Sequence, residues 1–287
     1  MRKKCEKIVK NDLFIKILFL RNSVVFSYFF AFFVFFIQNN DLFAQNNINF
    51  IQKRDYSAYC DERKTLNESF ISGEKLKYKI SYGNENRKLN RILAGHAQLN
   101  VTAFKNNKNE KLYELNASGK TTKLFSLIFK VKHTYRALIE FNSLKTREFA
   151  MSIREGKYTN EDSAILSNKN QISDLLSTFY QMRTIPKKDI SIIDTLYFSY
   201  LYQGSIYNSF IINHGEEIIK TKFGDITTIK LEPFLEKGRI FKSSFGTFIW
   251  VSADDMHIPI KIEMPVLVGC VYVNLVKYEN TCFEFNK

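Results

Sequence analysis

The chain has 287 residues, with 42 Lys and Arg against 29 Asp and Glu, and 45% of its residues are hydrophobic. This length suffices for one large β domain, or two small ones, with a real core. The basic residues are scattered singly, without a dense patch interleaved with aromatic residues, which excludes a nucleic-acid-binding protein.

The first 44 residues have the three parts of a cleavable secretory signal. Residues 1–21 hold seven Lys and Arg, residues 24–37 (VVFSYFFAFFVFFI) are uncharged, and Ala44 offers the small residue before a cut at Gln45. The alternative is a retained membrane anchor, but an uncharged run of 14 residues is short for a span of about 20. We therefore predict an exported protein, in the periplasm or at the outer membrane, with no membrane span after cleavage.

Without this signal the chain keeps 35 basic and 26 acidic residues, a net charge of +9. Such a charge attracts anionic envelope lipids or polysaccharide. A compositional bias of the whole genome would also produce it, since the chain is rich in Lys, Asn, Ile and Phe throughout. A lipid or another envelope component is thus one candidate partner, and the oligomeric state is left open.

Residues 45–69 form a polar spacer, and residues 70–287 read as a single β domain with alternating strands. Residues 75–82 (KLKYKISY) alternate between one apolar and one lysine face, which predicts a half-buried strand. The same alternation predicts strands at 95–104, 113–117, 125–135, 149–153, 196–202, 209–213, 217–222, 226–231, 239–241, 247–252, 258–264 and 266–278. Short turns between them favour antiparallel pairing.

Residues 171–183 (QISDLLSTFYQMR) break the alternation, because their apolar residues recur at helical spacing. Ser173 or Asp174 can cap this helix, and Pro186 follows its end. The predicted fold is therefore mainly β: a twisted antiparallel sheet that curls into an open barrel, with one amphipathic helix packed on it.

Three cysteines remain after the signal, and their spacing matches no metal motif. A bridge from Cys60 to Cys282 would tie the two ends of the domain together, whereas Cys270 reads as a buried thiol in an apolar strand. No phosphate-cradling glycine loop or nucleophile elbow occurs, so we predict no cofactor and no metal.

His257 beside Asp254 and Asp255 is the one local cluster of acids and an imidazole. It suits cation binding or acid–base chemistry, although Asp-Asp ahead of Pro259 is also ordinary turn composition. Trp250, the only Trp, could stack on a sugar or lipid or anchor the core.

Asp174, Tyr180 and Arg183 lie on or beside the polar side of the predicted helix. They could ring the mouth of a pocket, or they could cap the helix and pair with the sheet.

Four segments in this order resemble the family of exported bacterial proteins known as domain of unknown function 3108. They are residues 73–78 (GEKLKY), 174–180 (DLLSTFY), 215–224 (GEEIIKTKFG) and 250–255 (WVSADD), and the resemblance covers about residues 68–280. It implies an exported, mostly antiparallel β protein of the type found in Bacteroidetes, with no assigned activity and no catalytic residues.

Three hypotheses follow. The first is a non-enzymatic envelope protein that binds an apolar ligand, such as an acyl chain, inside the barrel or serves in envelope assembly. The second is a hydrolase or glycan-processing enzyme in which the 254–257 cluster faces a cleft near Arg183 or Arg239. The third is a partner-binding module with an exposed edge strand or apolar patch, although the lysine face of 75–82 argues against that strand as an open edge.

Overall fold

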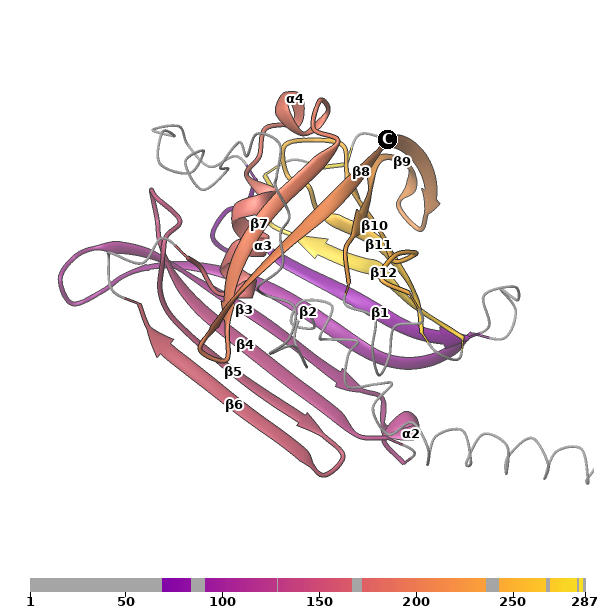
Figure 1. The fold of residues 1–287 in the computed structure, drawn as a ribbon, viewed down its shortest axis with the longest axis horizontal. Coiled ribbons are helices and arrows are strands. Elements are labelled where there is room, and N and C mark those ends of the chain that lie inside the picture. The colour runs from indigo at the N-terminus through magenta and orange to yellow at the C-terminus, as the bar shows by residue number, and fades with distance from the viewer. Residues whose placement is uncertain are drawn as a thin grey trace, which may run out of the picture.

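The computed structural model describes residues 69–83, 91–127, 129–166, 172–235, 243–266, 269–282 and 284–285. The predicted signal and nearly all of the predicted spacer lie outside these residues. The described chain forms one antiparallel sheet in the strand order β6-β5-β4-β3-β2-β1-β12-β11-β10-β9-β8-β7, which curls without closing (Figure 1). The predicted fold class is confirmed.

The sheet has two halves. The first contains β1 (Lys75–Gly83), β2 (Ile92–Lys105), β3 (Lys111–Thr121), β4 (Val131–Glu140), β5 (Thr146–Glu155) and β6 (Tyr158–Ile165). The second contains β7 (Thr195–Tyr202), β8 (Ser205–Thr221), β9 (Gly224–Pro233), β10 (Phe248–Ser252), β11 (Pro259–Pro265) and β12 (Cys270–Glu279). Pairing of β1 with β12 joins the halves, so β1 is an inner strand, as its lysine face indicated.

The alternation read from the sequence decides which face of each strand is buried. In β1 the side chains of Leu76, Tyr78 and Ile80 are buried, whereas Lys75 and Lys79 are exposed. The same two-residue period continues in β4, where Val131 to Ile139 alternate between the core and the outer face. The inner faces of both halves thus share one core.

Helix α3 (Leu175–Arg183) packs on this inner face against β3, β4 and β7 (Figure 1). Its Tyr180 ring is fully buried, with its centroid 5.0 Å from that of Phe70. Asp174 bridges to Leu201 of β7, and the Gln203 backbone N–H donates to Asp162 of β6. The helix and these two contacts span the space between the edge strands.

The periodicity predicted a helix from residue 171, but the helix begins at Leu175 because Asp174 is its N-cap and has an extended backbone. The Asp174 carboxylate accepts hydrogen bonds from the backbone N–H groups of Leu176 and Ser177, the N-cap arrangement. The predicted end at Arg183 is confirmed. A further short helix, α4 (Lys187–Ile190), follows Pro186.

The predicted strand across 125–135 is wrong in its first half. Residues Lys123–Ser126 form the short helix α2, and β4 begins only at Val131. The Thr122 side chain accepts a hydrogen bond from the Phe125 N–H and so caps this turn. Because the chain turns here, Phe125 points into the core while Leu124 and Leu127 point outward.

Candidate functional site

A buried ion pair lies where α3 meets the start of β1. The Arg183 guanidinium donates to both carboxylate oxygens of Glu74, over 2.7 and 2.8 Å, and both side chains are almost fully buried. It also donates to the backbone carbonyls of Ser69 and Met256, each over 3.0 Å. Burial opposes the charge of Arg183, but the adjacent Glu74 carboxylate outweighs burial and holds the pKa of Arg183 above its ordinary value. All this donor capacity is directed into the fold.

The loop between β10 and β11 brings Asp254, Asp255 and His257 close together in structural contacts. The Asp254 carboxylate accepts from the backbone N–H groups of Met256 and His257, and Asp255 accepts from the Lys187 N–H over 2.8 Å. His257 is buried, and its ring nitrogens face the carbonyl oxygens of Ser252 at 3.2 Å and Ile185 at 2.8 Å. Burial lowers the pKa of His257, although these carbonyl contacts oppose the shift.

The remaining predicted residues have similar surroundings. Asp174 is buried at the start of α3, where burial raises its pKa against the hydrogen bonds that it accepts. Burial also raises the pKa of Tyr180. Trp250 is buried, and its indole N–H donates to Glu217. Arg239 and Cys60 lie outside the described residues, so neither the placement of Arg239 nor the pairing of Cys60 with Cys282 can be followed.

The structure thus brings Arg183 and the loop that carries Asp254, Asp255 and His257 together, in contacts that support the fold. Arg183 links α3 to the loop that carries His257, because it donates to Met256. The hydrolase hypothesis requires these groups to face a cleft, whereas Arg183 and His257 are both less than 5% exposed. We call Glu74, Arg183 and residues 254–257 the polar clamp. Through it Arg183 ties α3 to Glu74, ahead of β1, and to the loop between β10 and β11, and so to both halves of the sheet.

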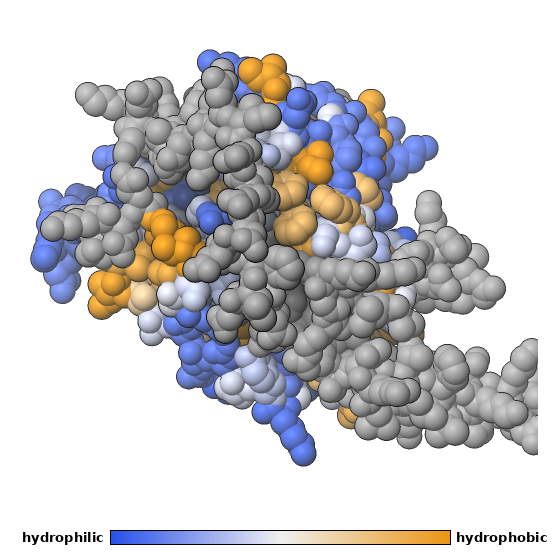
Figure 2. All heavy atoms as spheres, viewed as in Figure 1, coloured by the Kyte–Doolittle hydropathy of each residue, from blue (hydrophilic) through white to orange (hydrophobic). Residues whose placement is uncertain are grey.

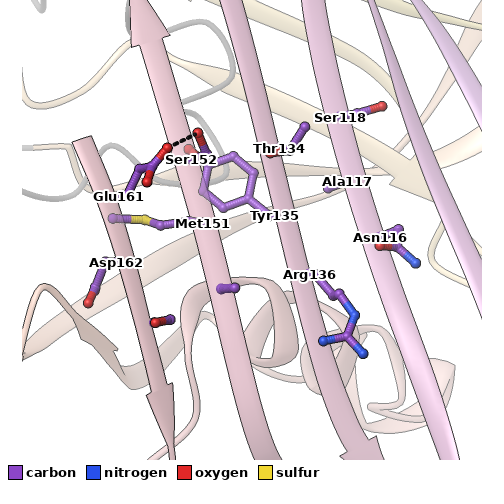
Figure 3. Close-up of a pocket in the computed structure, with 12 residues that line it drawn as sticks. Asn116, Ala117, Ser118, Thr134, Tyr135, Arg136, Met151, Ser152, Glu161 and Asp162 are labelled. Carbon is purple, nitrogen blue, oxygen red and sulfur yellow. Dashed lines mark hydrogen bonds between the residues drawn. The ribbon is translucent and has the colours of Figure 1, made fainter. Parts of the chain in front are cut away.

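An open depression of about 920 Å³ lies on the outside of the sheet, over β3 to β6 (Figure 3). Its outward-facing side chains are mostly small and polar, and we call them the outer trough: Asn116, Ser118, Thr134, Arg136, Ala150, Ser152, Glu161 and Ser163. They alternate with Ala117, Tyr135 and Met151, which point to the core. Small side chains in adjacent register therefore line most of this depression.

One side of the outer trough is held by a network of charges. Arg136 donates to Glu114 and to Glu148, each over 2.7 Å. The hydrogen bond from Arg136 lowers the pKa of Glu114, and the pKa of Arg136 is raised by the same bond. One arginine lies between two glutamates here, so the network has a net negative charge.

The other side carries unbalanced positive charge. Register places Lys79 opposite His96, His96 opposite Lys120, Lys120 opposite Lys132, and Lys132 opposite Arg154. We call these five residues the cationic row; all five are exposed on the outer face of β1 to β5. Arg154 pairs with Glu161 at 3.4 Å, but Lys79, Lys120 and Lys132 contact no carboxylate in the described part of the chain.

Sequence reasoning found the lysine face of β1 but missed the cationic row. Its members lie on five strands, from residue 79 to residue 154, so only the strand register brings them together. Gly95 helps to set that register, because a Cβ there would lie 2.7 Å from the Lys120 carbonyl oxygen.

The described residues contain no group of three or more His, Cys, Asp or Glu side chains that could hold a metal ion. They also contain no helix with the length and apolar character needed to cross a membrane.

Comparison with known proteins identifies a family. A family model described as "Protein of unknown function (DUF3108)" matches residues 77–173 and 164–276. Among curated proteins, none matches this chain in sequence. A beta-barrel-like protein of unknown function (DUF1849) from Brucella abortus is similar in structure, with a TM-score of 0.46 and 7% identity over 73% of this chain and 98% of its own.

Two further solved structures are similar at 11% identity. One, from Bacteroides fragilis, is described as exported and YmcC-like in fold; its TM-score is 0.33, covering 75% of this chain and 99% of its own. The other, from Parabacteroides distasonis, is described as a lipoprotein; its TM-score is 0.34, covering 76% of this chain and 100% of its own.

Proposed function

Since this chain belongs to the DUF3108 family, for which no function is known, its role has to be derived from its own residues, and we propose an exported, non-enzymatic protein of the cell envelope. Its task is to bind an anionic envelope component on the outer face of the first half of the sheet. The signal-like first 44 residues support export, and the cationic row supports the binding.

The observation that carries this proposal is the direct opposition of like charges. Side chains opposite each other on neighbouring strands have Cβ atoms about 5 Å apart, and like charges there destabilise a sheet. Lys120 and Lys132 are such a pair, and Lys132 is opposite Arg154 as well. An anion bound across the cationic row would remove this repulsion. Without a bound anion, the opposed charges do not stabilise the sheet.

The inner face of the curled sheet is covered by α3, which favours a binding surface on the outer face. Helix α3 occupies the inner face, where Tyr180 packs on Phe70, and Phe70 packs in turn on Tyr113 of β3. Two depressions of the described surface, of about 920 and 500 Å³, are open to the outside. Helix α3 thus takes up part of the inner space in which the acyl-chain hypothesis would place a ligand.

A charge-removal variant tests the proposal. We expect Lys79→Gln/Lys120→Gln/Lys132→Gln to elute from phosphocellulose at clearly lower salt than the purified wild-type protein, and wild-type retention to fall as salt rises. The measurement is the salt concentration at elution.

The matched control is Lys108→Gln/Lys188→Gln/Lys220→Gln, which removes the same charge from exposed positions outside the row. Equal loss of retention in both triple variants would mean that net charge alone drives binding, and the proposal would be wrong.

A further inference from the structure

One end of the first sheet half carries exposed apolar side chains. In α2, the side chain of Leu124 is 73% exposed and the neighbouring Leu127 is 83% exposed. Ile92 and Leu93, at the start of β2, are 53% and 38% exposed. We call these four residues the apolar tip. On the face seen in Figure 2, hydrophobic residues form separate patches among hydrophilic ones.

The apolar tip is held rigidly in place. Phe125 anchors α2 in the core, and the Thr121 and Ser126 hydroxyls are 2.8 Å apart. The Thr122 N–H donates to the Ala94 carbonyl over 2.9 Å, so α2 is joined to the segment of β2 that contains Leu93. Leu124 and Leu127 are not part of the core, and this fixed turn therefore presents both side chains outward.

The apolar tip lies beside a cluster of exposed lysines. Lys120 and Lys123 flank the start of α2, and Lys130 and Lys132 follow it; all four are exposed. No acidic residue occurs between Glu114 and Glu140. The nearest acid on β5, Glu155, is buried against His133 at 2.9 Å. No carboxylate on these strands neutralises the lysines around the tip.

We infer that the apolar tip docks on the surface of an anionic lipid bilayer. Leu124 and Leu127 enter the boundary between headgroups and acyl chains, and the surrounding lysines contact the anionic headgroups. Exposed apolar residues ringed by lysines are the pattern of proteins that lie on such a surface. This inference rests on the proposed function and specifies its anionic component as the bilayer surface.

Other exposed apolar residues do not share this setting. Ile165, Ile192 and Ile218 are exposed singly, on β6, after α4 and on β8. Single exposed apolar side chains are normal on protein surfaces and indicate no partner. The combination of clustering, rigid support and lysines separates the tip from them.

The test uses cosedimentation with vesicles of phosphatidylglycerol and phosphatidylcholine, against vesicles of phosphatidylcholine alone. We expect the purified protein to bind only the anionic vesicles. Leu124→Ser/Leu127→Ser should weaken that binding by about tenfold or more, since both side chains lose their burial in the membrane. Ile192→Ser/Ile218→Ser is the matched control and should bind as the wild type does.

A second measurement reports how deeply the side chain at position 127 enters the membrane. In a Leu127→Trp variant, phospholipids with brominated acyl chains should quench the new fluorescence, whereas buried Trp250 should be quenched little. Unchanged vesicle binding by the double serine variant, or an unquenched Trp at 127, would overturn the inference.

The two proposals fail in different ways. Phosphocellulose retention depends on the cationic row, so the double serine variant should keep it in full. Retention that resists removal of the row refutes the proposed function. Retention without vesicle binding refutes only the bilayer, and a fall in solution mass of the serine variant would then identify the tip as a protein interface.

Discussion

Arg183 connects more separate parts of the fold than any other residue of the polar clamp. It holds Glu74 through two hydrogen bonds and reaches the carbonyls of Ser69 and Met256. A bidentate guanidinium suits this position, since it satisfies four acceptors from one buried side chain. The pair is expensive to bury, so its value lies in joining segments that are distant in sequence.

Breaking this pair from one side should be costly. Glu74→Gln leaves the Arg183 charge buried without its carboxylate, and we expect the free energy of unfolding to fall by about 3–5 kcal/mol. Urea denaturation measures it. Glu74→Leu/Arg183→Met removes both charges. Its free energy of unfolding should fall by much less than the sum of the losses of Glu74→Leu and Arg183→Met alone. Additive losses would show that the two groups act independently.

His257 should make stability depend on pH. Burial depresses its pKa in the folded protein, so the unfolded chain binds a proton more readily. Its contribution is therefore complete above about pH 6.5 and is lost as the pH falls through the folded-state pKa. Denaturation at neutral and mildly acidic pH should show a smaller acid-induced loss for His257→Asn than for the wild type.

Asn is the suitable replacement because His257 has a φ of 43°, in the left-handed region that Asn tolerates. The same acid-induced loss in both proteins would assign the pH dependence to other groups.

At the scale of elements, Asp174 decides where α3 begins. Its carboxylate accepts from two backbone N–H groups and from the hydroxyls of Ser177 and Thr146. Asp174→Ala should lower the free energy of unfolding by about 1–2 kcal/mol, the usual cost of losing an N-cap. Asp174→Asn keeps a capping oxygen and should lose less. Thermal or urea unfolding of both variants distinguishes them, and equal losses would show that the cap is not the cause.

The α2 segment shows why alternation alone misassigned an element. Phe125, Leu127 and Phe129 recur at every second position, as they would in a strand. The Thr122 cap and the contact with β2 form only after folding, and they turn Leu127 outward. In so short an apolar run, periodicity alone cannot distinguish a strand from a helix.

For the whole molecule, the two faces of the first sheet half have different tasks. The inner face, with α3, supplies the core and the polar clamp. The outer face carries the cationic row, and its end carries the apolar tip. In the proposed function, α3 fills the inner face and the outer face is the one that binds a partner.

The sequence alone determined the fold class, most of the strands and the helix, because the periods of two and 3.6 are local properties of the chain. It also selected Asp174, Arg183, Asp254 and His257 as candidate site residues, whereas the contact of Arg183 with the loop that carries His257 was decided by the tertiary structure. The cationic row and the apolar tip were decided only by tertiary structure. Strand register sets which lysines lie opposite each other, and register follows from pairing between residues far apart in the chain.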